Sequence, residues 1–433
     1  MSNKANKTRD LCELVRIFES HFADEGKKRG LFGIEARAGR AGREVEAQSI
    51  REELLKLDRG YEGAVRTCPK CGKKQRYGGD RERVVTFECG EFKIQRAYYS
   101  CNHCGTSSVP LDEKLGIVDG REQGKLREKL SMIGVLTSYH QSPQVCETLL
   151  GHGEHAATIR RCVSRESKRL SDIEELPSLV SANESDTLYL EIDGHMCPTR
   201  EEKKTSSDQG YREAKVVMAF KASDVADISK DRNEILNLKL RGEIASANDF
   251  MGTVSDVYER VNGKDAGRVV ILGDGAPWIW NIASDVMPEA VQILDYSHAK
   301  SYLYHAAENL YGKDSDLSSA WSRKQKERLF DNQVDLVIND LKQYVSSCPA
   351  LQTSITYFEN NRTRMLYGKY RADGLMIGSG AIESAGKRIA QGRIKGCGMR
   401  WNVSDLNDFL RLRCSFLDRS WKDFWETQYA LAA

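Results

Sequence analysis

The chain has 433 residues, of which 40% are hydrophobic and 30% charged, and its formal net charge is +2. This composition excludes a disordered chain, and the length is enough for two or three domains with a large core. No apolar stretch approaches the roughly 18–20 residues of a membrane span, and the polar N-terminus lacks a signal-peptide core, so a cytoplasmic protein is expected. A net charge near zero also excludes binding to nucleic acid through bulk charge alone.

Residues 1–60 are predicted to form an N-terminal helical region. The run Arg37–Arg43, in which Arg alternates with Ala and Gly, is interpreted as a flexible basic joint. It would serve either as a simple linker or as a segment that follows a minor groove. An apolar stripe at helical spacing precedes it, formed by Leu11, Leu14, Val15, Phe18 and Phe22.

Two CxxCG motifs are the most specific signal in the next segment, residues 61–112. Each motif makes a tight turn that presents two thiolates, and four thiolates in tetrahedral array are the preferred ligands of structural zinc. The alternating residues between the motifs suit a β-hairpin. We therefore predict a zinc ribbon with one Zn²⁺, and Cys89 and His103 are interpreted as non-ligands. The predicted ligands are Cys68, Cys71, Cys101 and Cys104.

Residues 121–172 are predicted to form a helix-turn-helix DNA-binding domain. Helices are expected at Gly124–Tyr139, at Ser142–Leu150 with Ser142 as the N-cap, and from His155 to Arg169, with a glycine break at residues 151–153. The last helix is basic, and Arg160 and Arg161 are its candidate DNA contacts in the major groove. A plain helical pair, without DNA binding, remains open.

From residue 187 the pattern changes to strands. Three strands (187–192, 214–220 and 234–240) are followed by a helix, a strand at 268–273, a helix at 278–286 and a strand at 290–294. This is the element order of an RNase H-like α/β core, in which the first and fourth strands lie side by side. Asp193 and Asp274 end those two strands, so their carboxylates are expected to meet.

Residues 301–370 are predicted to be an all-helical insertion in that core, with amphipathic helices at about 320–345 and 354–366. Residues 371–433 would complete the core and contribute basic C-terminal helices. Glu383 lies there, where a loop turns into a helix. Residues 360–413 carry eleven Lys or Arg against four acidic residues. The candidate phosphate contacts in this segment are Lys387, Arg388, Arg393, Lys395 and Arg400.

Together these motifs resemble those of bacterial insertion-sequence transposases with an acidic (DDE) triad, of the mutator-like type, and are most similar to the ISKra group. The resemblance implies that Asp193, Asp274 and Glu383 are the catalytic residues and hold two Mg²⁺ or Mn²⁺ ions. The partners that it implies are double-stranded DNA, both element ends and target, and a second copy of the chain, as a homodimer or larger assembly. It also implies association with the nucleoid. The matching motifs are Arg96–Cys104, Glu191–Gly194, Gly273–Trp278, Asp295–His298 and Gly378–Ser384.

In the expected reaction, Asp193 bridges both ions, while Asp274 and Glu383 each hold one of them. Asp295 and His298 are auxiliary candidates, which either orient a ligand or phosphate or form a helix-capping pair. His195 is expected to point away from Asp193 and is left out of the site. Trp278 and Trp280 are interpreted as core residues, with stacking on a flipped base as the alternative.

Two other functions remain open. One is an RNase H-like DNA nuclease or resolvase, which would cleave DNA without joining it. The other is a non-catalytic DNA-binding protein with a zinc ribbon and a helix-turn-helix.

Overall fold

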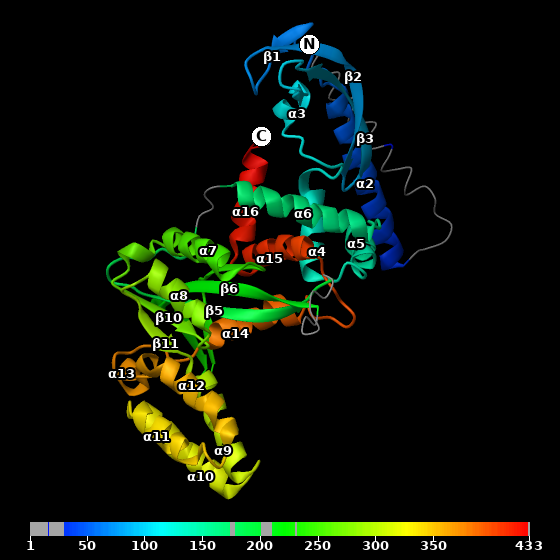
Figure 1. The fold of residues 1–433 in the computed structure, drawn as a ribbon. Coiled ribbons are helices and arrows are strands. Elements are labelled where there is room, and N and C mark those ends of the chain that lie inside the picture. Colours follow the sequence, from blue (N-terminus) through cyan, green and yellow to red (C-terminus); the bar gives the residue numbers. More distant parts are fainter. Residues whose placement is uncertain (1–15, 17–29, 174–177, 201–209, 230–231, 432–433) are drawn as a thin grey trace. The chain divides into compact units, whose positions relative to one another are not determined.

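The chain folds as a mixed α/β protein, seen in a computed structural model that describes residues 16, 30–173, 178–200, 210–229 and 232–431 (Figure 1). The expected apolar stripe from Leu11 to Phe22 lies outside the described residues. Two compact units are present, one formed by residues up to 134, 139–165 and 425–433, and the other by residues 135–138 and 166–424. No helix in the described part of the chain is long and apolar enough to cross a membrane.

The first unit contains a four-stranded antiparallel sheet in the order β1-β2-β3-β4. The long hairpin of β2 and β3 confirms the hairpin predicted between the two cysteine motifs. Helix α2 packs on this hairpin, where Ala47 joins Val85, Phe92 and Ile94 in a small apolar core. The elements are α2 (Leu31–Leu55), β1 (Val65–Thr67), β2 (Lys74–Phe87), β3 (Gly90–Ser100), β4 (Ser107–Ser108) and α3 (Pro110–Leu115).

The interpretation of Arg37–Arg43 as a flexible joint is wrong, because the run lies inside α2. Arg and Ala are among the strongest helix formers, and each of the two glycines costs only about 1 kcal/mol in a helix. Ala41, in the middle of the run, is fully buried. The burial of one helix face therefore outweighs the local flexibility of glycine.

The three helices predicted over residues 121–172 are present, and their apolar faces share one core cluster. They are α4 (Gly124–Leu136), α5 (Ser142–Leu150) and α6 (Ala156–Asp172), and the cluster includes Leu126, Leu130, Cys146, Ile159 and Cys162. Gly151 ends α5 in a left-handed conformation with φ 77°, which glycine adopts without strain. Ser142 is not the N-cap: it is the first helical residue, and its hydroxyl donates to the Tyr139 carbonyl oxygen. The first unit also includes the end of α16 (Ser420–Leu431).

The second unit is built on a five-stranded sheet in the order β11-β10-β5-β6-β9. Strand β10 runs parallel to both β5 and β11, whereas β6 is antiparallel to β5 and β9. The expected adjacency of the first and fourth strands is confirmed, because β5 and β10 pair along their length. The strands are β5 (Thr187–Pro198), β6 (Tyr211–Lys221), β9 (Lys239–Glu243), β10 (Arg268–Gly273) and β11 (Val291–Leu294).

The third strand lies later in the sequence than predicted. Residues 234–240 do not form one strand, because Asp224 accepts hydrogen bonds from the Leu236 amide and the Asn237 side chain and turns the chain there. The first part of the run joins a separate hairpin of β7 (Val225–Ser229) and β8 (Arg232–Ile235). Only the residues after the turn enter the main sheet, as β9.

Helices cover both faces of the main sheet (Figure 1). Helices α7 (Ala247–Arg260) and α8 (Pro277–Val286) lie on one face, where Trp278 of α8 packs against Phe250 of α7 and beneath Lys215 of β6. Trp278 is therefore a packing residue. On the other face lie α14 (Gly380–Gly386), which packs on β5 and β6, and α15 (Val403–Leu417), which packs on β9, with the π-helical turn η5 (Lys387–Gln391) directly after α14. Glu191, Asp193 and His195 of β5 point to this second face, because alternate residues of a strand share a face and Glu191 bonds to α14.

The segment between β11 and α14 is helical, as predicted, but it divides differently. The helix expected over about 320–345 is two helices, because Asn332 takes a left-handed φ of 59° between them, a conformation that Asn tolerates better than most residues. The helix expected at 354–366 ends at Asn360. The elements are α9 (Tyr296–Tyr311), α10 (Asp316–Phe330), α11 (Val334–Tyr344), α12 (Gln352–Asn360) and α13 (Tyr367–Ala372), with short 3₁₀ turns η1 (Ala222–Asp224), η2 (Gly263–Asp265), η3 (Pro349–Leu351) and η4 (Arg362–Arg364) elsewhere in the unit.

Candidate active site and metal centre

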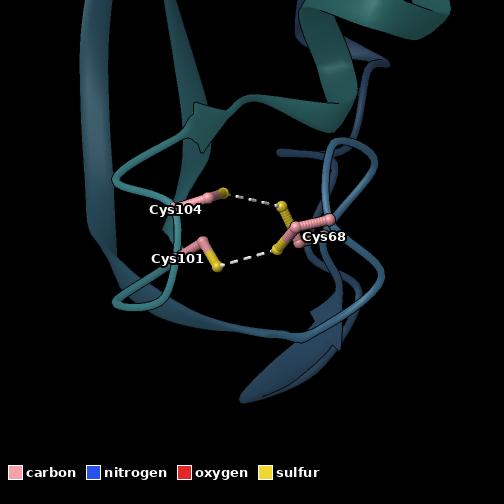
Figure 2. A group of neighbouring side chains, drawn as sticks. Cys68, Cys101 and Cys104 are labelled. Carbon is pink, nitrogen blue, oxygen red and sulfur yellow. Dashed lines mark hydrogen bonds between the residues drawn. The ribbon is translucent and has the colours of Figure 1, made fainter.

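The four cysteines of the two CxxCG motifs converge in the first unit (Figure 2). The sulfur atoms of Cys68 and Cys104 lie 3.6 Å apart, as do those of Cys71 and Cys101, and all four lie within 4.8 Å of one another. Tetrahedral zinc with Zn–S bonds of about 2.3 Å requires sulfur separations of about 3.8 Å. The cluster can therefore hold a structural metal ion such as zinc, and neither Cys89 nor His103 belongs to it.

One of these thiols is prepared for metal binding by its own turn. Hydrogen bonds from the side chain and backbone of Thr106 lower the pKa of the Cys104 thiol to about 6. A thiolate, rather than a thiol, is the form that ligates metal. The turn after the second motif therefore favours the ligating form of Cys104. At Cys71, a hydrogen bond from the Lys73 backbone lowers the pKa, but burial and the neighbouring thiols outweigh it and raise the pKa to about 12.

In the second unit, Asp193 and Asp274 lie side by side at the end of the paired segment of the parallel strands β5 and β10. Ile192 lies opposite Gly273 in the parallel register, so the next residue of each strand is an aspartate. Burial raises the pKa of the Asp193 carboxyl, and the nearby Asp274 carboxylate raises it further, whereas His195 and His298 oppose the shift. Two carboxylates that repel each other in a partly buried place are an arrangement that a divalent cation relieves.

His195 was wrongly expected to point away from this site. Its Nε2 atom lies 3.6 Å from Oδ2 of Asp193, because residues two apart on a strand share a face. This Nε2 is buried and has no hydrogen-bond partner among the described residues. The imidazole fits against the backbone of Gly386 in α14, where an added Cβ would lie 1.7 Å from Nε2. An imidazole nitrogen so placed can ligate a metal ion or accept a proton from water.

Two buried carboxylates hold the start of α14, the helix that carries Glu383. Glu191 accepts a hydrogen bond from the Ile382 amide at 2.7 Å. Asp295 accepts from the amide and hydroxyl of Ser379 at 2.5 and 2.8 Å, and its other oxygen caps α9 by accepting from the His298 amide at 2.7 Å. These contacts tie the helix to both β5 and the end of β11. Asp295 therefore acts on the site through the backbone of two helices.

Glu191 was not singled out from the sequence, although it lies two residues before Asp193 on the same face. It is fully buried, and burial raises the pKa of its carboxyl to about 8. Its Oε1 atom has no hydrogen-bond partner among the described residues. The period of two along β5 could have identified both Glu191 and His195 beside the aspartate.

Glu383 lies on α14, but its carboxylate is not grouped with those of Asp193 and Asp274. Its side chain is 58% exposed and forms an ion pair with Lys387 one turn later, with Oε1 and Nζ 2.8 Å apart. Apart from the cysteines, no group of three or more His, Cys, Asp or Glu side chains among the described residues lies close enough together to hold a metal ion. The structure therefore brings Asp193 and Asp274 together and leaves Glu383 bound to its own helix.

The remaining candidates for DNA contact differ in exposure. Arg393 does not lie on the surface: it is buried, with its guanidinium over the rings of Trp401 and Phe409 at 5.0 and 5.1 Å. The two aromatic faces attract the guanidinium, and its apolar stem packs with them. The exposed candidates are Arg160, Arg161, Lys387, Arg388, Lys395 and Arg400.

A cleft of about 690 Å³ opens beside Asp274. It is bounded by the start of α8, by His298 and Tyr302 of α9, by α12 and by Arg364. His298 is exposed to solvent and lines this cleft. Its charge also acts to lower the pKa of the Asp193 carboxyl, which places it close to the two aspartates.

These features define a mixed α/β protein with a four-cysteine metal-binding cluster and a group of acidic and imidazole side chains at adjacent strand ends. Residues 33–422 match the uncharacterised protein family UPF0236, and the chain belongs to that family. No protein among those with curated descriptions matches the chain.

Proposed function

We propose that the chain is a DNA transposase of the mutator-like type, similar to the ISKra group, with an RNase H-like core. The observation that carries the proposal is the pairing of β5 with β10, which brings Asp193 beside Asp274. The sheet order also agrees with that core, since the first and fourth strands are neighbours and the third is an edge strand.

Asp193 and Asp274 would hold the divalent ions, and His195 adds a nitrogen that lies 3.6 Å from Asp193 and accepts or donates no hydrogen bond among the described residues. When bound, such ions supply activation of water and stabilisation of the leaving 3′ oxygen. Glu383 would complete the site by exchanging its ion pair with Lys387 for the metal. An exposed pair of this kind contributes little to stability, so breaking it costs little free energy.

The other parts of the chain would serve binding to double-stranded DNA. The four-cysteine ribbon, with zinc as its ion, and the helices α4–α6 would contact element ends, with Arg160 and Arg161 exposed on α6. Exposed basic residues after Glu383, among them Lys395 and Arg400, would contact phosphates. Two element ends must meet in such a reaction, which favours a homodimer or larger assembly.

A joining assay tests this proposal. The full-length protein is mixed with a labelled duplex that carries the native element end and with a plasmid target, in Mg²⁺ or in EDTA. We expect labelled DNA to appear covalently in the plasmid, only with Mg²⁺, and to disappear with Asp274→Asn. Asp285→Asn is the matched control, because Asp285 is an exposed aspartate of the neighbouring helix α8.

Each other result selects a different function. Cleavage without joining would replace the transposase by an RNase H-like nuclease or resolvase. Binding to the duplex without any chemistry, unchanged in Asp274→Asn, would leave a non-catalytic DNA-binding protein.

A further inference from the structure

Aromatic and uncharged polar side chains form much of the wall of the cleft beside Asp274. Three aromatic rings line it, those of Trp280, Tyr302 and Tyr357, together with exposed amide and hydroxyl side chains. The latter are Asn281, Thr353, Thr356 and Asn360. Such a wall offers flat apolar surface together with both hydrogen-bond donors and acceptors.

The aromatic wall is fixed to the candidate site. The rings of Tyr302 and Tyr357 are stacked, with centroids 3.6 Å apart and planes 12° from parallel. The Tyr357 hydroxyl donates to the backbone oxygen of Asp274 at 2.8 Å. A flat group that extends this stack would therefore be held at a set position relative to the Asp274 carboxylate.

Two polar atoms of this wall are buried. Nε1 of Trp280 and Oδ1 of Asn361 have no hydrogen-bond partner within the described part of the chain, although Trp280 is 5% and Asn361 2% exposed. One is a donor and the other an acceptor. Both atoms are covered by their neighbours, so a ligand in the cleft could pair with them only if binding moved the wall; the hydrogen-bonding groups open to the cleft are those of Asn281, Thr353, Thr356 and Asn360.

The charge of the cleft argues against a phosphate as that ligand. Among the described residues that line it, Arg364 is the only Lys or Arg. Its guanidinium lies 4.5 Å over the Trp280 ring and donates to Oε1 of Gln292 and to the Asn360 carbonyl oxygen. Asp274 adds negative charge at the other end. A planar, uncharged and polar-edged group fits these walls better than an anion.

We infer that this cleft is a subsite for one unpaired nucleobase of the DNA substrate, next to the phosphate that divalent ions at Asp193 and Asp274 would hold. The choice of DNA rests on the proposed function, whereas the nature of the ligand rests on the cleft. Its volume, about 690 Å³, lies within the range of about 300–1,000 Å³ typical of small-molecule sites. It also lies outside the carboxyl ends of parallel strands, where ligands of α/β sheets bind. A paired base cannot enter it, so the base must be unstacked first.

The test uses a duplex with a short single-stranded thymidine extension that contains one 2-aminopurine, with the full-length protein in Ca²⁺ instead of Mg²⁺, so that DNA is bound without being cut and the cysteine cluster keeps its metal. Fluorescence of the 2-aminopurine reports stacking, and anisotropy of a distant dye reports binding. We expect the wild-type protein to quench the 2-aminopurine. Tyr302→Ala should lose the quenching and bind the extended duplex about tenfold more weakly, with unchanged affinity for a blunt duplex.

Matched variants separate the subsite from general damage. Tyr304→Ala removes an exposed tyrosine of the same helix that does not line the cleft, and should keep the quenching. Tyr302→Phe should also keep it, because the ring face remains. The double variant Thr356→Ala/Asn360→Ala changes only exposed wall residues and should weaken binding of the extension several-fold without unfolding the protein.

The outcomes are distinct. Binding of both duplexes without quenching, or quenching that persists in Tyr302→Ala and in the double variant, would overturn the subsite and leave the proposed function in place. Binding of neither duplex by the wild-type protein would overturn both.

Discussion

Replacing Cys101 by Ser should release the metal ion from the first unit and loosen its sheet, while the second unit stays folded. Two sulfur pairs of the cluster are 3.6 Å apart, close to the separation of about 3.8 Å expected around tetrahedral zinc with Zn–S bonds of about 2.3 Å. All four sulfur atoms lie within 4.8 Å of one another, so zinc binding requires at most small movements of the thiols. Structural zinc binds with on the order of 10–16 kcal/mol, and one ligand of four corresponds to about 3 kcal/mol, or roughly a hundredfold in affinity.

The measurement combines metal analysis with hydrogen exchange. We expect the wild-type protein to contain one zinc per chain and Cys101→Ser to lose it after dialysis. Amides of β2 and β3 should then exchange faster, whereas those of β5 and β10 should not change, because they belong to the other unit. Cys89→Ser is the control, since this partly buried cysteine lies outside the cluster. Full zinc content in Cys101→Ser, or none in the wild type purified under reducing conditions, would refute the reasoning.

Three further predictions concern the second unit. Without metal, the free energy of unfolding should fall as pH rises from about 5 to 8, by at most on the order of a few kcal/mol, because the folded state keeps the Glu191 proton to about pH 8 and the unfolded chain loses it near pH 4.5. Glu191→Gln should flatten this slope in urea titrations, and an unchanged slope would assign it to other groups. Lys387→Gln should tighten Mg²⁺ binding about twofold in calorimetry, because the weak pair with Glu383 no longer competes; no change would mean that Glu383 does not reach the ion. His195→Ala should weaken Mn²⁺ binding more than Mg²⁺ binding, since imidazole suits the softer ion, and an equal loss for both would argue against ligation beside Asp193.

Local patterns in the sequence predicted those elements whose signals are short-range. The strand at residues 268–273, the helix Ser142–Leu150 and the hairpin between the cysteine motifs all appear as expected. In each of these elements, the spacing of apolar residues and the turn residues at the two ends indicate the same type of element and the same limits. The predictions failed where a single residue or a contact distant in sequence set the end of an element. Examples are Asn332, which separates two helices, and Asp224, which fixes the turn before β9.

The sequence by itself also determined which chemistry the chain carries: four thiols in two motifs, and acidic residues at the ends of strands. The spacing within each CxxCG motif was enough to pair its two cysteines, and the predicted hairpin between the motifs brings the two pairs together. The alternation along β5 was equally local, and correct use of its period would have placed Glu191 and His195 beside Asp193.

Only the tertiary structure decided how the acidic groups are arranged. The hydrogen bonds of Glu191 and Asp295 to the start of α14 join segments that are far apart in sequence. The same is true of the cleft, where α8, α9 and α12 meet beside Asp274. The pairing of Glu383 with Lys387 is local, but whether it prevails over an approach to the aspartates depends on how α14 lies on β5. Such contacts depend on the path of the whole chain and on the burial that fixes it, which no local period of residues encodes.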